Sequence, residues 1–578
     1  MTASQQAQTP HRRQPLVVAV TGHRDLVSSE IDGIRSRVRT LFTLLRDSYP
    51  DLELRLMSPL AEGADQLAAE VALEMNVPLD VPLPMPVNDY LREFDDDSAA
   101  ERFHSLYTAA DSVFVLSTGA AETAPAERYA RLGIFLASHC HVLLAIWDGK
   151  DSDKLGGTSQ VVQFHHDDIM PGYAAKSGVS QQMLIDDESD LVFHVVCSRN
   201  RPDGAPAAGL KAFDWCWFTK DEQKPRSKIL PAAHHSVLQR ASEFSADAQR
   251  FAGQIEAGSA SLVSDKIAAL DVEGLEPVDT TFRVADFLAI HYQKKSLYTL
   301  RVTHAFAFAM GALFILYSEL AAEQPLLYLF LVCFGAATLV QGLASRRGWF
   351  RKYLDYRTLA EGLRVQFYWA LAGISQNDLE NYSHDEFLQL QDPEVGWIRN
   401  TMRVAGTVTD AIPHDNSAAL GVAIDEWVGD GHTGQLGYYA HKALDRTRRR
   451  RITDLLGRVS LVASAVVVIV LLVAGTRLPP DLFGPMLALM GILLLLFAVR
   501  HAYAHAIAES ELIKQYEFML RIFANAGKRL GTAGSDRQRR QILTVLGRSA
   551  LDEHAQWIMM HRERSLDQTE IWRLGSGS

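Results

Sequence analysis

The chain has 578 residues, which is enough for two or three domains. Its net charge of -12 at pH 7 argues against long nucleic acid as a partner, because nucleic-acid-binding domains usually carry a basic surface. The four cysteines show no CxxC spacing, which argues against a disulfide framework and against a cysteine zinc site.

The segment before the first predicted strand is polar. Residues 1–14 contain no apolar stretch of the kind that forms the core of a signal peptide. We therefore expect residues 1–14 to be disordered and the domain that follows to stay in the cytosol.

Strands and helices alternate over residues 15–200. Short runs rich in Val, Ile and Leu predict strands at 16–20, 52–57, 79–83, 112–116 and 141–146. This alternation predicts an α/β domain with a Rossmann-like, doubly wound parallel sheet. A further strand over 190–196 is expected at an edge of the sheet.

Glycine, hydroxyl and charged residues gather where the predicted strands end. Such sheets bind ligands at the carboxyl ends of their strands. Helix starts there can offer free amides to a phosphate. Each turn or cap has a structural explanation when taken alone, but together they favour a nucleotide-like ligand. The predicted ligand-binding residues are Thr21, Gly22, His23, Arg24, Ser58, Glu62, Gly63, Ala64, Asp65, Asp148, Gly149, Gly156, Gly157, Thr158 and Ser159.

Several motifs of this domain resemble the SLOG superfamily, which includes the LOG phosphoribohydrolases. The motifs are TGHRDL (21–26), SPLAEGADQLAAEVAL (58–73), LPMP (83–86), ERYARLG (127–133), AIWDGK (145–150) and GGTSQVV (156–162). The resemblance covers about a third of the chain. It implies a Rossmann-like domain that binds a nucleotide or a nucleotide derivative.

One position departs from the LOG pattern. The LOG motif Gly-Gly-x-Gly-Thr-x-x-Glu ends in a catalytic glutamate, and aligning its threonine with Thr158 puts Val161 at the glutamate position. An aliphatic side chain cannot act as an acid or a base. The resemblance therefore favours a sensor over an enzyme. Catalytic residues stay unassigned, although Glu62, Asp65 and Asp148 remain as carboxylates that could act.

Four apolar runs approach the roughly 20 residues that a helix needs to cross a bilayer. They cover 302–320, 325–343, 459–475 and 482–499, and very short connections join them into two separate hairpins. None has a central Asp, Glu, Lys or Arg, which argues against an ion-coupled transporter.

Basic residues flank the hairpins on the side away from their tight loops. The densest cluster consists of Arg446 and residues 448–451. By the positive-inside rule, both termini are expected in the cytoplasm.

Each hairpin is followed by a similar amphipathic stretch, at 359–369 and 507–518, which suggests duplication of one membrane unit. The hairpin and the helix after it resemble the two-helix membrane effector units called SLATT, which accompany SLOG domains in bacterial conflict systems. The predicted segments are 1–14, a nucleotide-binding domain at 15–200, an extension at 201–290, a hairpin with its cytosolic helix at 291–375, a connection at 376–445, a second hairpin with its helix at 446–530, and a cytosolic tail at 531–578.

These observations predict a cytosolic nucleotide sensor coupled to a membrane effector of the bacterial inner membrane, in antiphage defence. The alternative is a membrane-anchored nucleotide hydrolase. The expected partners are a nucleotide-derived small molecule, membrane lipid and further copies of the chain. We expect no metal and no resident cofactor.

Overall fold

The computed structural model describes residues 13–94, 97–116, 124–174, 190–220, 226–270, 272–320, 322–374, 393–411, 416–474 and 478–573. These residues form two compact units. The first falls within Met1–Phe287, Thr358–Leu420 and Gly547–Ser578, and the second within Leu288–Arg357 and Gly421–Leu546.

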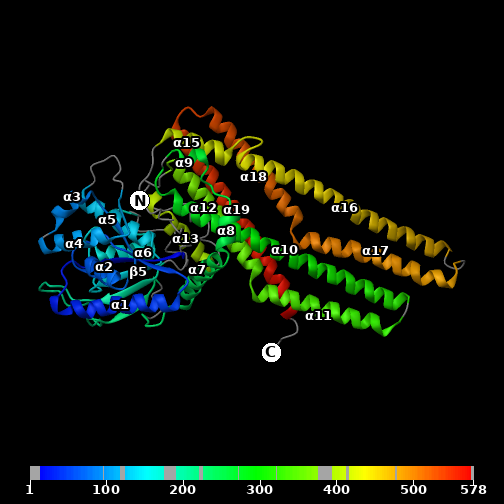
Figure 1. Cartoon of the computed structure of the whole chain (residues 1–578), viewed down its shortest axis with the longest axis horizontal. Helices are drawn as coiled ribbons and strands as arrows, with labels where there is room; N and C mark the ends of the chain where they lie inside the picture. Colours follow the sequence, from blue (N-terminus) through cyan, green and yellow to red (C-terminus); the bar gives the residue numbers. More distant parts are fainter. Residues whose placement is uncertain are drawn as a thin grey trace, which may run out of the picture. The chain divides into compact units, whose positions relative to one another are not determined.

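One seven-stranded sheet organises the described part of the first unit (Figure 1). Its strands, in the order β4-β3-β2-β1-β5-β6-β7, are parallel except for the last pair. The predicted Rossmann-like sheet is thereby confirmed, and its winding direction reverses between β1 and β5. The strands are β1 (Pro15–Gly22), β2 (Glu53–Met57), β3 (Leu79–Leu83), β4 (Ser112–Val115), β5 (Val142–Trp147), β6 (Val192–Val196) and β7 (Trp215–Phe218).

Helices cover both faces of the sheet. Val17 and Ala19 of β1 belong to a core shared with α5 (Pro125–Ser138) and α6 (Thr158–Asp167). The other face carries α1 (Ile31–Ser48) and α2 (Ala64–Glu74), which pack against each other. Because both faces are covered, the strands read as nearly continuous apolar runs.

The prediction of an edge strand over 190–196 is wrong in its position. β6 lies inside the sheet, and β7 pairs with it antiparallel as the edge strand. Phe193 of β6 contacts both tryptophans of β7, with ring centroids 5.0 Å from Trp215 and 4.8 Å from Trp217. All five residues of β6 are buried, which a strand at the edge would not require.

Segments distant in sequence complete the first unit. His139, at the end of α5, places Nε2 3.1 Å from Asp410 Oδ2 in α14 (Thr407–Ala411). The ring of Phe244 in α7 lies 5.4 Å from that of Trp397 in α13. The sheet domain therefore packs against residues from beyond the first membrane hairpin. Its further described helices are α3 (Val87–Tyr90), α4 (Asp97–Ala109), α7 (Ala232–Arg250), α8 (Ala252–Gly258), α9 (Asp265–Ala268) and α13 (Gly396–Ala405).

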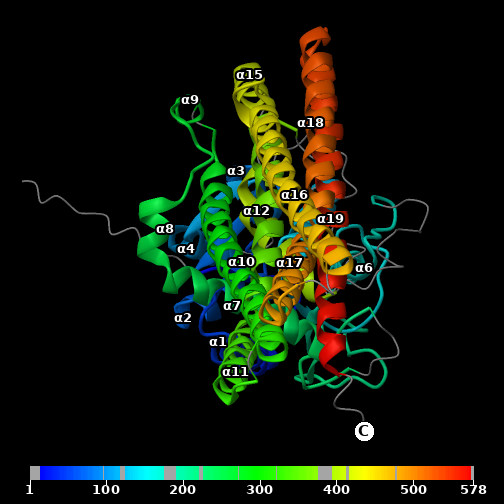
Figure 2. The same cartoon turned by 90° about the vertical axis from the view of Figure 1, so that its right-hand side faces the viewer.

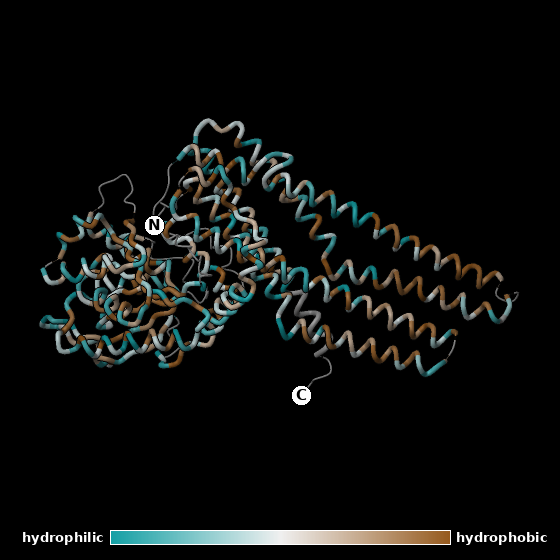
Figure 3. Tube along the Cα trace, viewed as in Figure 1, coloured by the Kyte–Doolittle hydropathy of each residue, from teal (hydrophilic) through white to brown (hydrophobic). Residues whose placement is uncertain are grey.

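Within the described residues, four helices are long and apolar enough to cross a membrane. They form the two predicted pairs, α10 with α11 and α16 with α17, and their apolar stretches are visible in Figure 3. Each pair is followed by a further helix, α12 or α18. The bounds are α10 (Leu275–Glu319), α11 (Gln324–Arg346), α12 (Trp349–Leu371), α15 (Ser417–Ala423), α16 (Gly434–Ala474), α17 (Pro480–Ala506), α18 (Glu509–Thr532) and α19 (Asp536–Arg573).

Small residues hold these helices close together. Helices α16 and α17 lie side by side (Figure 2). In α16, Ser460 Oγ donates to the Leu493 carbonyl of α17 at 2.6 Å. A Cβ added at Gly491 of α17 would lie 3.1 Å from Ile315 of α10, and one added at Gly311 of α10 would lie 2.6 Å from Leu495. The two hairpins, separate in sequence, thus contact each other through α10 and α17, in the way that small residues allow between membrane helices.

Candidate functional site

The winding reversal brings the ends of β1 and β5 together. Thr21 and Gly22 still belong to β1, where they pair with Ala145 and Ile146 of β5. A Cβ added at Gly22 would lie 2.4 Å from Ala64 Cβ, so only glycine allows the start of α2 to approach β1 this closely. Ligands of open α/β sheets bind at this kind of switch point.

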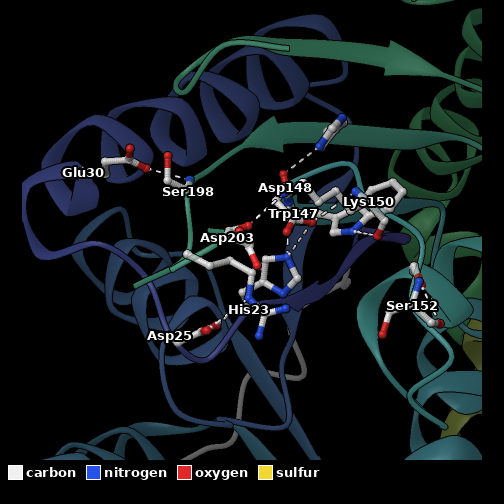
Figure 4. A network of polar contacts seen from close by, with 12 residues as sticks. His23, Asp25, Glu30, Trp147, Asp148, Lys150, Ser152, Ser198 and Asp203 are labelled. Atoms are coloured by element: carbon white, nitrogen blue, oxygen red, sulfur yellow. Dashed lines mark hydrogen bonds and ion pairs between the residues drawn. The ribbon is translucent and has the colours of Figure 1, made fainter. Parts of the chain in front are cut away.

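His23 and Asp148 meet across the two strand ends (Figure 4). His23 Nε2 lies 3.0 Å from Asp148 Oδ1, which also accepts a hydrogen bond from the Lys150 amide at 3.1 Å. Burial lowers the pKa of His23, although Asp148 acts in the opposite direction. Asp148 is 1% exposed, and its Oδ2 has no hydrogen-bond partner among the described residues.

Residues 199–210 contact the β5–β6 side of this point. Arg199 Nε donates to Asp25 Oδ1 at 2.9 Å, and the Ala207 amide donates to the Asp148 carbonyl at 2.8 Å. Gly149 packs against Leu210. The predicted ligand residues of the Arg24–Asp65 segment lie on the other side of β1, towards β2, β3 and β4.

On that side, a tight turn starts α2. The Ala64 amide donates to the His23 carbonyl at 3.1 Å. Gly63 has φ +85°, and a Cβ there would lie 2.3 Å from the Arg24 carbonyl oxygen. Ser58 is fully buried; its hydroxyl donates to the Asp65 carbonyl and accepts the Leu60 amide. Ser58 was predicted to bind the ligand, but its hydroxyl is used in the hydrogen bonds of this turn. Glu62, also in the turn, is half-buried.

We expect Gly63→Ala to destabilise the first unit by about 2–4 kcal/mol, through the positive φ and the clash with the Arg24 carbonyl. Thermal unfolding of the full-length protein, followed by tryptophan fluorescence, measures this. Gly172→Ala is the control, because Gly172 also has a positive φ but has nothing within 4 Å. Equal losses in both variants would mean that the close approach at Gly63 carries no weight.

Arg24 and Asp65 lie among aromatic residues that sequence reasoning missed. The Arg24 guanidinium carbon is 5.3 Å from the ring centroid of Tyr129, near the start of α5. Tyr90, at the end of α3, has its ring centroid 6.4 Å from that of Tyr129. Tyr129 is part of the ERYARLG motif, so that motif carried a signal for it; Tyr90 follows LPMP without one.

Burial raises the pKa of Asp65 to about 8, although the nearby Arg24 guanidinium acts in the opposite direction. The carboxyl is therefore neutral at pH 7. Its Oδ1 has no hydrogen-bond partner among the described residues. A neutral carboxyl beside a guanidinium can donate a hydrogen bond to a ligand.

The start of α6 is more closed than the sequence predicts. The Gly156 amide donates to Gln160 Oε1 at 3.1 Å, and the Gly157 amide donates to the Lys154 carbonyl at 2.9 Å. Ser159 exchanges hydrogen bonds with the backbone of Ser152. Thr158 is 8% exposed. These contacts leave fewer free donors for a phosphate than the sequence suggested.

Gly156 nevertheless places this segment beside the site. A Cβ there would lie 2.7 Å from the Ala130 amide nitrogen, next to Tyr129. Val161 points away from it: the side chain is 2% exposed and packs on Gly133 of α5. The position that holds a glutamate in the LOG motif is thus a core position here.

Among the described residues, no group of three or more His, Cys, Asp or Glu residues could hold a metal ion. No family model matches the chain, and no curated protein matches it either.

Proposed function

We propose that the protein is a nucleotide sensor that acts on a membrane through its four apolar helices. The observation that carries the proposal is the grouping of Arg24, Asp65, Tyr90 and Tyr129 at the carboxyl ends of the strands. An exposed guanidinium suits a phosphate, and aromatic rings suit a base. The resemblance of these strand ends to the SLOG superfamily supports the same ligand class.

Chain continuity offers a route from the site to the membrane. The boundaries between the two units at Phe287 and Arg357 fall inside α10 and α12. A ligand that prefers one conformation of the first unit shifts the equilibrium between conformations, and helices shared with the second unit carry that bias. We propose that assemblies of the chain then permeabilise the bacterial inner membrane, with both termini cytoplasmic.

The test uses the full-length protein in detergent, because the sheet domain packs against residues 393–411 and cannot be assumed to fold without them. The panel contains cyclic oligonucleotides, ADP-ribose derivatives and nucleoside monophosphates. Thermal stabilisation by one ligand without turnover, followed by ligand-dependent leakage of liposomes, supports the sensor. A ligand that binds and leaves the liposomes sealed contradicts the effector part of the proposal.

Arg24→Ala should weaken binding of that ligand about ten- to hundredfold, the range for a lost hydrogen bond to a charged group. Isothermal titration calorimetry gives the affinity. The control is Arg39→Ala, on α1, where Arg39 pairs with Glu74 far along the helix from the strand ends. An unchanged affinity in Arg24→Ala would place the ligand elsewhere.

The membrane-anchored hydrolase remains the second candidate, because of one observation. Asp65 is a carboxyl that holds its proton at pH 7, and a general acid must do so. Product analysis in the same panel decides: turnover that disappears in Asp65→Asn supports the hydrolase.

A further inference from the structure

Two buried polar atoms near Arg24, Asp65 Oδ1 and Tyr90 Oη, have no hydrogen-bond partner among the described residues. The buried Tyr129 hydroxyl beside them faces the Arg24 guanidinium. Asp65 is 6% exposed and Tyr90 is 1% exposed. Leaving such an atom unpaired is costly, so native proteins seldom do it without a reason. Two of them beside a guanidinium and a further hydroxyl indicate a binding site built for a polar group.

These atoms come from three different elements that converge at the strand ends. Asp65 is in the first turn of α2, Tyr90 ends α3 after β3, and Tyr129 is the fifth residue of α5. Burial raises the pKa of Tyr90 well above its usual value, and the nearby Tyr129 and Asp65 add to the effect. Tyr90 therefore lies within electrostatic reach of Tyr129 and Asp65, and Arg24 lies within reach of all three. Arg24 is exposed, which leaves the group open to solvent on that side.

The chemistry of this group favours an anion. Two phenol hydroxyls and a guanidinium donate hydrogen bonds, and Asp65 donates as well while it keeps its proton. Glu93 is the acidic residue that acts on both tyrosines. A neutral sugar hydroxyl would leave the guanidinium without a counter-charge. The start of α6 offers the anion fewer donors than the sequence suggested, because the Gly156 and Gly157 amides before the helix are already used.

We propose that the phosphoryl group of the ligand binds between Arg24, Tyr90, Tyr129 and the Asp65 carboxyl, rather than at the start of α6. The proposal rests on the proposed function for the identity of the ligand as a nucleotide, but not for the binding of an anion. If the anion binds beside Asp65, its affinity depends on pH. When Asp65 ionises, its negative charge faces the anion, and affinity falls.

The test uses two anions that keep a constant charge between about pH 6.5 and 9: sulfate, and ADP-ribose, which is a diester of diphosphate. Affinities are measured by calorimetry on the full-length protein in detergent. We expect the wild-type affinity for sulfate to fall about tenfold between about pH 6.5 and 9, because Asp65 titrates near pH 8. Asp65→Asn, which is neutral at every pH, should bind sulfate with no such fall.

Variants of the two tyrosines test the site independently of the ionisation of Asp65. Tyr90→Phe and Tyr129→Phe keep the rings and should each weaken sulfate binding about tenfold, the effect of one lost hydrogen bond to a charged group. Thr158→Ala should leave it unchanged. Loss of sulfate binding in Thr158→Ala alone, or an affinity independent of pH in the wild type, overturns the proposal.

The two probes separate this proposal from the proposed function. Sulfate binding with the expected pH dependence, together with no binding by any nucleotide, keeps the anion site and contradicts the nucleotide sensor. Nucleotide binding that is insensitive to Tyr90→Phe, Tyr129→Phe and pH keeps the sensor and overturns the anion site. Absence of binding by sulfate and by every nucleotide of the panel overturns both.

Discussion

The Asp65→Asn protein should be more stable than the wild type above about pH 8, and the two should converge near pH 4. The pKa of Asp65 is about 8 in the folded protein, raised by burial, against about 3.9 in an unfolded chain. Between these values the folded state keeps a proton that the unfolded state releases. Wild-type stability therefore falls as pH rises through this window, by up to about 1.4 kcal/mol per pH unit.

Asparagine has no proton to lose, so the stability of the variant does not follow this trend. The difference should grow from about pH 4, reach a few kcal/mol, and level off above about pH 8. Midpoints of thermal unfolding, measured by tryptophan fluorescence between about pH 4 and 9, give the comparison. The control is Asp89→Asn, an exposed partner of Arg92, which should run parallel to the wild type. A parallel curve for Asp65→Asn as well would show that Asp65 ionises normally.

Gly491→Leu should separate α17 from α10. Gly491 faces Ile315, and the larger side chain has no room unless the helices move apart. Overpacking of this kind costs about 1–3 kcal/mol. We expect a lower midpoint of thermal unfolding in detergent and the loss of any ligand-dependent leakage, because the two hairpins would no longer move as a packed set.

The matched control for this variant is Gly335→Leu in the apolar stretch of α11. Gly335 has nothing within 4 Å, so the same substitution adds the same apolar surface without a clash. Equal effects of Gly335→Leu and Gly491→Leu would attribute the loss to membrane insertion and not to the packing of α10 on α17. An unaffected Gly491→Leu protein would contradict the close approach of these helices.

Local patterns were sufficient to predict the sheet and the apolar helices. Five strands were placed from short apolar runs, because strands covered on both faces must be apolar on both faces. The four membrane-length helices followed from length and the lack of charge. The position of β6 did not follow, since β7 (Trp215–Phe218) lies about twenty residues further along and its four residues give no alternation strong enough to reveal a strand.

The residues of the candidate site also fall into those that the sequence could predict and those that it could not. Glycine turns at Gly22 and Gly63 were recognisable, because close approach and positive φ require glycine and leave a mark in the sequence. Tyr90 was not recognisable, since a tyrosine in a helix is usually a packing residue, and the only signal for Tyr129 was its place in the ERYARLG motif. Only the fold brings them beside Arg24. Likewise, the amides at the start of α6 seemed free from the sequence, and only the folded loop shows that Gln160 and Lys154 occupy them.

The sequence by itself therefore determined which segments are strands, which helices are apolar enough to cross a membrane, and which turns need glycine. These properties depend on hydrophobic periodicity and backbone sterics, which act over a few residues. Tertiary structure alone decided the strand order, the contact between the hairpins at Gly491, and the pKa of Asp65. Each of these depends on contacts between residues that are far apart in the chain. The pKa of Asp65, for example, is raised because such residues bury its carboxyl away from water.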